Sequence, residues 1–109
     1  MNRVYKILSA GDWAAAQALG AYSGSADDAR DGFIHLSTAE QVRETARRYF
    51  AGKPDQLLVA FDTTALGPAL RWEPSRGGAL FPHLYGAAPV DMAVSVQPLP
   101  NGDDDWPTA

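Results

Sequence analysis

Hydrophobic and polar positions along the chain predict a mixture of short strands and helices. Residues 3–8 alternate between the two kinds of side chain, as strands with one buried face do. The alanine-rich run 13–19 predicts a helix, and Gly20 suits the left-handed position that follows a helix end. Residues 21–31 are small and polar, so we expect a loop with one helical turn there.

The clearest helical pattern spans residues 38–50. Ser37 or Thr38 can cap this helix, because a glutamate or glutamine follows each of them three residues later. The charged residues lie away from a face with helical spacing that holds Ala39, Val42, Ala46, Tyr49 and Phe50. We expect this face to pack against a sheet and to bury Phe50 fully.

The apolar run 57–61 does not alternate, which is typical of a strand that is covered on both faces. Other short strands are predicted at 33–36, 70–73, 80–85 and 92–96, and the last of these should turn Val94 and Val96 inward. Several short strands with one main helix indicate an α+β fold with small split or antiparallel mixed sheets, not a doubly wound sheet.

A chain of 109 residues fits a single domain, which we place at residues 1–99. Residues 100–109 contain two prolines, a glycine and three consecutive aspartates, and they predict an acidic flexible tail. Without those aspartates the chain has nine basic and ten acidic residues, so the body carries almost no net charge. A nearly neutral body is not expected to bind duplex DNA.

The composition excludes several other classes of protein. The chain has no cysteine, so disulfides, Cys-ligated zinc and a thiol nucleophile are ruled out. No stretch approaches the ~20 apolar residues that span a membrane. The first residues do not resemble a signal peptide, and we expect a cytoplasmic protein without membrane contact.

His35 and Ser37 lie two residues apart in a predicted extended segment, so their side chains project from the same face. Ile34 and Leu36 point the other way, toward the core. The start of the next helix offers free N–H groups to a phosphate or carboxylate. We therefore treat His35 and Ser37 as candidate ligand-binding residues, with a structural histidine and a simple helix cap as the alternatives.

His83 and Tyr85 repeat this spacing among apolar residues. Polar groups in such surroundings need partners, which can be structural groups or a ligand. His83 is a candidate acid or base, and Tyr85 is a candidate ligand-stacking residue.

Glu73 and Arg76 lie in the turn between two predicted strands. Pro74 favours an extended Glu73, while Arg76 precedes two glycines and can form a bidentate contact with a phosphate or carboxylate. Glu73 is a candidate catalytic carboxylate and Arg76 a candidate anion-binding residue. The alternative is a surface ion pair between them, worth less than ~1 kcal/mol.

Common catalytic motifs are missing from the sequence. It has no phosphate-binding loop, dinucleotide glycine motif, nucleophile elbow or paired-histidine zinc helix. A metal triad of His35, His83 and Glu73 would require three segments to converge. Two histidines and no cysteine supply few good metal ligands, and we expect no metal site.

Four segments resemble the hallmarks of the bacterial domain-of-unknown-function family 952. They are DGFIHLST at 31–38, LRWE at 70–73, SRGG at 75–78 and FPHLYG at 81–86. The resemblance extends from about residue 4 to residue 96. The fold of that family is grouped with the ADP-ribosyltransferase-like split-sheet folds, which implies a cleft between two small sheets that could hold a nicotinamide dinucleotide.

The resemblance also implies roles for individual residues. The segment from His35 to Ser37 resembles the histidine-x-serine/threonine element that holds the nicotinamide ribose in some of those transferases, and Tyr85 resembles their stacking tyrosine. Their catalytic glutamate comes after the tyrosine, whereas Glu73 comes before Tyr85. The resemblance thus implies a nucleotide-binding cleft and leaves open whether the protein is an enzyme.

Two interpretations of function follow. In the first, the protein binds a small anionic ligand such as a nucleotide or NAD fragment in a cleft. His35 and Ser37 orient this ligand, Arg76 meets its anionic group and Tyr85 stacks on it.

An enzyme of this kind would transfer or hydrolyse a group at a glycosidic bond. Glu73 would stabilise the positive charge that develops as this bond breaks, or His83 would act as an acid or base. The alternative is a non-catalytic structural or interaction module in which the same residues form a rigid corner. On the first interpretation, we expect all six candidate residues to converge around one cleft.

Overall fold

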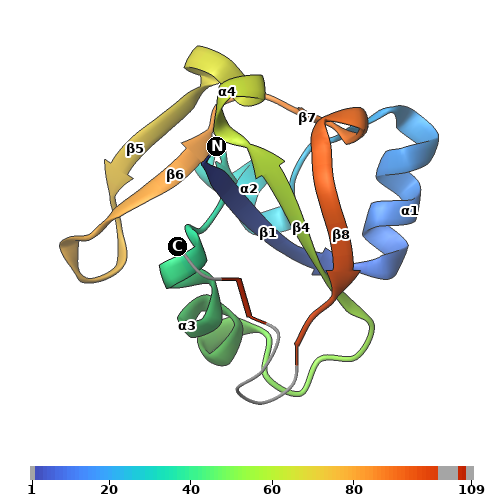
Figure 1. Ribbon diagram of the computed structural model, residues 1–109, viewed down its shortest axis with the longest axis horizontal. Helices are drawn as coiled ribbons and strands as arrows, with labels where there is room; N and C mark the ends of the chain where they lie inside the picture. The colour runs from blue at the N-terminus through green and yellow to red at the C-terminus, as the bar shows by residue number, and fades with distance from the viewer. Residues whose placement is uncertain (1, 101–105, 108–109) are drawn as a thin grey trace.

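Two three-stranded antiparallel sheets, joined at one point, form the frame of the molecule (Figure 1). The computed structural model describes residues 2–100 and 106–107. The first sheet has the strand order β1-β4-β8. Its strands are β1 (Arg3–Ser9), β4 (Gln56–Asp62) and β8 (Ala93–Pro98).

The second sheet has the order β3-β6-β5 and meets the first beside β1. Its strands are β3 (Ile34–His35), β6 (Leu80–Leu84) and β5 (Leu70–Pro74). Tyr5 and Ser37 exchange backbone hydrogen bonds of 2.7 and 2.9 Å, which tie the segment after β3 to β1. A separate two-stranded pair consists of β2 (Ala21–Tyr22) and β7 (Ala88–Pro89).

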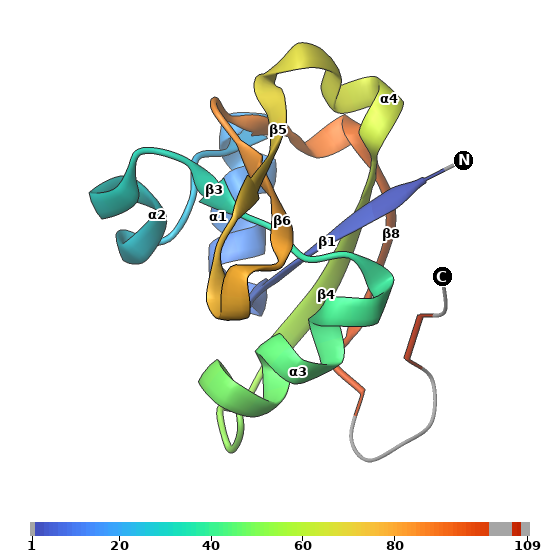
Figure 2. The ribbon, with the colours of Figure 1, turned by 90° about the vertical axis from the view of Figure 1, so that its left-hand side faces the viewer.

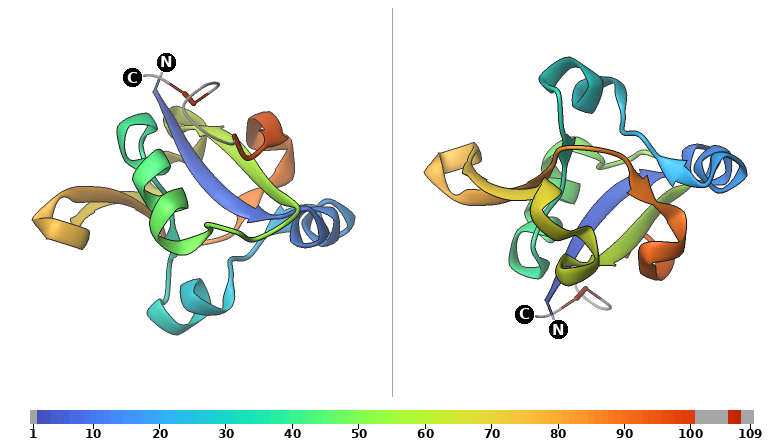
Figure 3. Two further views of the ribbon diagram at one scale, coloured as in Figure 1. Left: turned by 90° about the horizontal axis from the view of Figure 1, so that it is seen from below. Right: turned by 90° about the horizontal axis from the view of Figure 1, so that it is seen from above.

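Helices connect these strands. They are α1 (Ala10–Leu19), α2 (Ala26–Asp31), α3 (Ala39–Tyr49) and α4 (Thr63–Leu66), with 3₁₀ turns η1 (Gly67–Ala69), η2 (Arg76–Gly78) and η3 (Val90–Met92). In Figure 2, α2 and α3 lie at opposite ends of the segment that contains β3. Figure 3 shows the tip of the β5–β6 hairpin projecting from the body on the side away from α1.

The α+β class with antiparallel sheets is confirmed, and most predicted elements are present. Gly20 ends α1 with φ 90°, as expected. The segment 21–31 holds more structure than the predicted loop with one turn, because it contains both β2 and α2. At ten residues, α1 is nearly as long as the eleven-residue α3, so the fold has two main helices instead of one.

Helix α3 covers one face of the first sheet. Thr38 and Gln41 form a reciprocal capping box at its start. Val42 and Ala46 are buried in a cluster that also holds Tyr5, Ile7, Leu58 and Ala60. The predicted packing of Val42 and Ala46 against the sheet is therefore confirmed.

The end of α3 differs from the prediction. Tyr49 is 57% exposed and Phe50 is only partly buried, so the expected full burial of Phe50 is wrong. The helix ends at Tyr49, and both side chains line a pocket between the two sheets.

The central strand β4 divides the core, which confirms the prediction of a strand covered on both faces. Leu58 and Ala60 face the α3 cluster, while Val59 and Phe61 belong to a second cluster. That second cluster joins the first sheet to α1, β3 and β6 through Trp13, Ile34 and Leu84, among others.

The expectation that Val94 and Val96 face inward is wrong, since they are 42% and 44% exposed. Their strand, β8, lies at the edge of its sheet. A shift in the pairing between Ala60 and Phe61 also leaves Val94 without an opposite residue.

The predicted acidic tail lies largely outside the described residues, its three aspartates included. Trp106 is described, and it packs against the α3 cluster beside Phe50 and Leu99. None of the helices in the described part of the chain has the length and apolar character of a membrane-spanning helix.

We predict that Leu58→Ala lowers the free energy of unfolding by about 2–5 kcal/mol, because Leu58 is fully buried in the central strand. Phe50→Ala should lower the free energy of unfolding by less than Leu58→Ala does, since Phe50 is already partly exposed to solvent. Urea unfolding monitored by circular dichroism measures both values. Val96→Ala is the control and should change stability by less than about 0.5 kcal/mol, so a loss at Val96 equal to that at Leu58 would contradict this account of the core.

Candidate functional site

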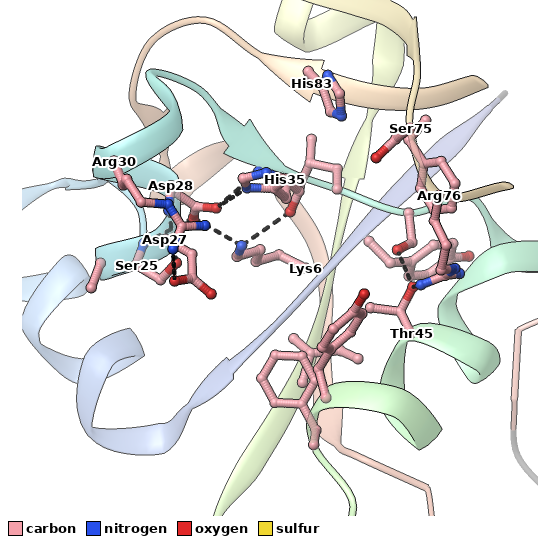
Figure 4. Close-up of a pocket in the computed structure, with 18 of the residues that line it drawn as sticks. Lys6, Ser25, Asp27, Asp28, Arg30, His35, Thr45, Ser75, Arg76 and His83 are labelled. Carbon is pink, nitrogen blue, oxygen red and sulfur yellow. Dashed lines mark hydrogen bonds and ion pairs between the residues drawn. The ribbon is translucent and has the colours of Figure 1, made fainter. Parts of the chain in front are cut away.

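A pocket of about 580 Å³ opens where the two sheets meet (Figure 4). Its wall comes from β1, α2, β3, the end of α3 and the tip of the β5–β6 hairpin. Four of the predicted site residues line it, namely His35, Ser37, Arg76 and His83.

A buried ion pair forms the floor on the side of α2. The Nζ atom of Lys6 lies 2.8 Å from Oδ2 of Asp28 and 3.0 Å from the carbonyl oxygen of His35, to both of which it donates. The side chains of Lys6 and Asp28 are only 9% and 2% exposed. The pair therefore ties β1 to α2 and β3 away from bulk water.

Local sequence explains why Asp28 is in this position. Ser25 caps α2, and Asp28 completes the capping box by accepting the backbone N–H of Ser25 at 2.8 Å. Its other oxygen accepts the backbone N–H of His35 at 3.0 Å. Burial by itself would raise the pKa of Asp28, but the contacts with Lys6, Ser25 and His35 outweigh it and lower that pKa.

Both ring nitrogens of His35 face carboxylates. Nδ1 is 2.6 Å from Asp28 and Nε2 is 2.9 Å from Asp31. The ring can donate to both carboxylates at once only as an imidazolium. With these partners in place, His35 has no ring nitrogen left for a ligand.

His83 has a different environment. Its Nδ1 lies 2.8 Å from Oε1 of Glu73, and the same oxygen accepts the hydroxyl of Tyr85 at 2.8 Å. Hydrogen bonds from His83 and Tyr85 lower the pKa of Glu73, and the bond to Glu73 raises the pKa of Tyr85. Phe33 stacks on the His83 ring with the centroids 4.0 Å apart.

Arg76 reaches the pocket from η2, at the tip of the β5–β6 hairpin. Both terminal guanidinium nitrogens lie 3.4 Å from Oγ1 of Thr45, and the guanidinium lies over the ring of Phe81. Thr45 also shares a hydrogen bond of 3.1 Å with Ser37, which is buried. The expected alternative of an ion pair between Arg76 and Glu73 does not form in the described residues.

The cations that line the pocket fall into two groups. Lys6 is paired with Asp28, and Arg30 is paired with carboxylates of its own helix. Arg76 and Lys53 have no carboxylate partner within residues 2–100 and 106–107. These two side chains therefore give the pocket its available positive charge.

Glu73 and Tyr85 do not line the pocket. Glu73 contacts Nδ1 of His83 and accepts the hydroxyl of Tyr85, and the ring of Tyr85 also contacts the guanidinium of Arg71. The structure thus brings four of the six predicted residues to the cavity and connects the other two to it through His83. Tyr49, exposed on α3, supplies an aromatic side chain to the pocket.

Four further residues of the pocket were not predicted from the sequence, namely Lys6, Asp28, Thr45 and Lys53. Only Asp28 had a recognisable signal, because a serine followed by an aspartate three residues later resembles a capping box. The other three depend on contacts between distant segments. Within the described residues, no group of three histidine, aspartate or glutamate side chains is arranged to hold a metal ion.

We predict that Asp28→Asn lowers the free energy of unfolding by about 3–5 kcal/mol, because it leaves the buried Lys6 ammonium without its counter-ion. Chemical unfolding of this variant, of Lys6→Gln and of the double variant measures the coupling. The double variant should lose less stability than the two single variants lose together. Strictly additive losses would contradict a coupled pair. Asp31→Asn, at a partly exposed carboxylate, is the control.

The pH dependence of stability should also differ between the native protein and Asp28→Asn. Folding lowers the pKa of Asp28, so its carboxylate stabilises the native state fully at pH values above the ordinary pKa of an aspartate. This stabilisation is lost as the pH falls through the lower pKa of the folded state. The stability difference between the native protein and Asp28→Asn should therefore shrink on acidification. Unfolding curves between neutral pH and about pH 3 test this, and a constant difference would be inconsistent with the role given to Asp28.

Comparison with known proteins supplies close structural relatives. A crystal structure of protein CC0527 from Caulobacter crescentus has a TM-score of 0.88 and 47% sequence identity, covering 95% of this chain and 90% of that chain. Its solution NMR structure gives a TM-score of 0.82 at 47% identity, covering 97% and 90%. No protein with curated annotation matches the chain.

A family model also matches residues 7–96, which is most of the chain. The family is described as a protein of unknown function, DUF952. With the match extending over both sheets and the pocket between them, the chain belongs to the DUF952 family.

Proposed function

We propose that this protein binds a small anionic ligand, a nucleotide or NAD fragment, in the pocket between its two sheets. The observation that carries the proposal is the distribution of charged side chains around the pocket. Lys6 and Arg30 are neutralised by neighbouring carboxylates, whereas Arg76 and Lys53 have no such partner in the described residues. A guanidinium and an ammonium that line the same pocket are suited to phosphate oxygens.

The size and lining of the pocket support a ligand of this class. Its volume of about 580 Å³ lies within the range of small-molecule sites. Tyr49 and Phe50 offer aromatic surface near Lys53, whose Nζ lies 5.2 Å from the centre of the Phe50 ring. A base or nicotinamide ring can stack there while its phosphate meets the cations.

The ADP-ribosyltransferase-like grouping belongs to this proposal. It is supported by the split into two small sheets and by the place of the segment from His35 to Ser37 in the pocket wall. Because carboxylates hold both ring nitrogens of His35, this support concerns the position of the segment and not a contact between the imidazole and a ligand. The reaction we propose for such a ligand is transfer or hydrolysis at a glycosidic bond. Because Glu73 lies behind His83, it acts on this reaction through the histidine and not by direct contact.

The alternative, a non-catalytic module in which these residues form a rigid corner, has support at one point. His35 is held on both sides by carboxylates, as a purely structural histidine would be. Such a module does not need a cavity lined by two cations, Arg76 and Lys53, that have no carboxylate partner in the described residues, which is why ligand binding is the preferred proposal.

We predict that Arg76→Gln weakens the binding of ADP-ribose by roughly 10- to 100-fold, the loss expected for charge-assisted hydrogen bonds. Isothermal titration calorimetry with ADP-ribose, AMP, NAD and inorganic phosphate measures the affinity. Arg47→Gln is the matched control, because Arg47 is an exposed arginine outside the pocket and is paired with Glu44. It should bind like the native protein.

Two results would contradict the proposal. One is the absence of binding by any of these four compounds at millimolar concentration. The other is an equal loss of affinity in Arg76→Gln and Arg47→Gln, which would show general charge attraction instead of a defined site. Thermal unfolding of each variant in the absence of ligand separates lost binding from lost folding.

A further inference from the structure

The two histidines of this chain differ in the way their ring nitrogens are used. In His35, carboxylates lie 2.6 and 2.9 Å from the two nitrogens. In His83, Nδ1 lies 2.8 Å from Glu73, while Nε2 has no hydrogen-bond partner among the described residues. Only His83 therefore has a nitrogen that is available to another molecule.

The carboxylate fixes which nitrogen of His83 carries the proton. An ionised carboxylate can only accept hydrogen bonds, so Nδ1 must donate to Glu73. In the neutral ring this leaves a lone pair on Nε2. Tyr85 holds the same carboxylate oxygen from the other side, and the stacked ring of Phe33 restrains rotation of the imidazole.

Nε2 is also reached from the pocket. His83 lines the cavity, and Figure 4 shows its side chain extending toward the space between His35 and Ser75. Within the described residues, the hydroxyl of Tyr22 is the one fully enclosed side-chain polar atom that lacks a hydrogen bond. Nε2 of His83 is not such an enclosed atom, although the side chain as a whole is only 5% exposed. The cavity that His83 lines is therefore the route by which another molecule can reach Nε2.

We propose that His83 is a general base that takes a proton from a hydroxyl group or water molecule in the pocket, with Glu73 as the residue that positions it. The substrate is a hydroxyl-bearing anion whose charged group is held by Arg76. This inference deepens the proposed function and rests on it for the presence of that anion.

The proton balance of this step is simple. The O–H bond of the hydroxyl or water breaks, its electron pair stays on the oxygen, and the proton moves to Nε2. The ring becomes an imidazolium, and the Glu73 carboxylate stabilises the new positive charge through Nδ1–H. The imidazolium then releases this proton from Nε2 to the product or to solvent, which restores the neutral ring. No metal or redox partner is needed.

Nitrogen-15 NMR of the full-length protein tests the tautomer directly. With two histidines in the chain, the spectrum holds two ring systems, and His83→Asn assigns them. At mildly alkaline pH we expect His83 to show a protonated Nδ1 and an unprotonated Nε2. Glu73→Ala should abolish this pattern, whereas Tyr85→Phe and the exposed control Glu40→Ala should keep it. A protonated Nε2 in the native protein would overturn the proposal.

Diethyl pyrocarbonate tests the availability of Nε2, because it acylates an unprotonated imidazole nitrogen. Mass spectrometry should find modification at His83 and little or none at His35. Modification of His35 in preference to His83, or of neither, would overturn the proposal.

The same reaction in the presence of ADP-ribose separates this inference from the proposed function. Protection of His83 by ADP-ribose, reduced in Arg76→Gln, supports both. Modification of His83 without protection by ADP-ribose, AMP or inorganic phosphate would contradict the proposed anion in the pocket, and with it the substrate assigned to His83, while leaving the tautomer result intact.

Discussion

The carboxylate of Asp28 organises the region around the pocket. It completes the cap of α2, neutralises Lys6 of β1 and binds both the backbone and the ring of His35 in β3. A carboxylate that is 2% exposed would destabilise the fold if any of these donors were missing, because burial of a charge is favourable only with full compensation. Strand β1 must therefore reach its place together with α2 and β3, although Lys6 is 22 residues from Asp28, and the shape of the pocket wall follows from that requirement.

The division into two sheets explains why a cavity exists between them. The sheets join through the pair of hydrogen bonds between Tyr5 and Ser37, next to the ion pair of Lys6. On one side of this junction the second apolar cluster fills the space between the sheets. On the other side the hairpin that carries Arg76 extends beyond the body of the molecule (Figure 3), and Thr45 of α3 contacts its guanidinium (Figure 4). The cavity is the space that the apolar core does not reach.

Sequence patterns predicted those parts of the fold that depend on local periodicity. The α3 helix and the central strand β4 have apolar faces that can be read from spacing alone, and both were found. Burial at the ends of elements depends on what lies opposite in the folded chain, which is why Val96 and Phe50 are more exposed than expected. The site shows the same limit: the spacing of His35 and His83 placed two polar side chains on a strand face, but Lys6, which shares the pocket, is one position in an ordinary alternating strand.

The contrast between the histidines also shows why residue type alone did not define their roles. His35 and His83 are opposite each other in neighbouring strands, with ring centroids 5.6 Å apart, and each has a carboxylate at Nδ1. The difference lies at Nε2, where α2 brings Asp31 to His35 and no described side chain reaches His83. A ring held at both nitrogens fixes a helix to a strand, whereas a ring held at one nitrogen keeps a lone pair for chemistry. One short helix thus occupies the second ring nitrogen of His35, whereas Nε2 of His83 keeps the lone pair on which our proposal of a general base depends.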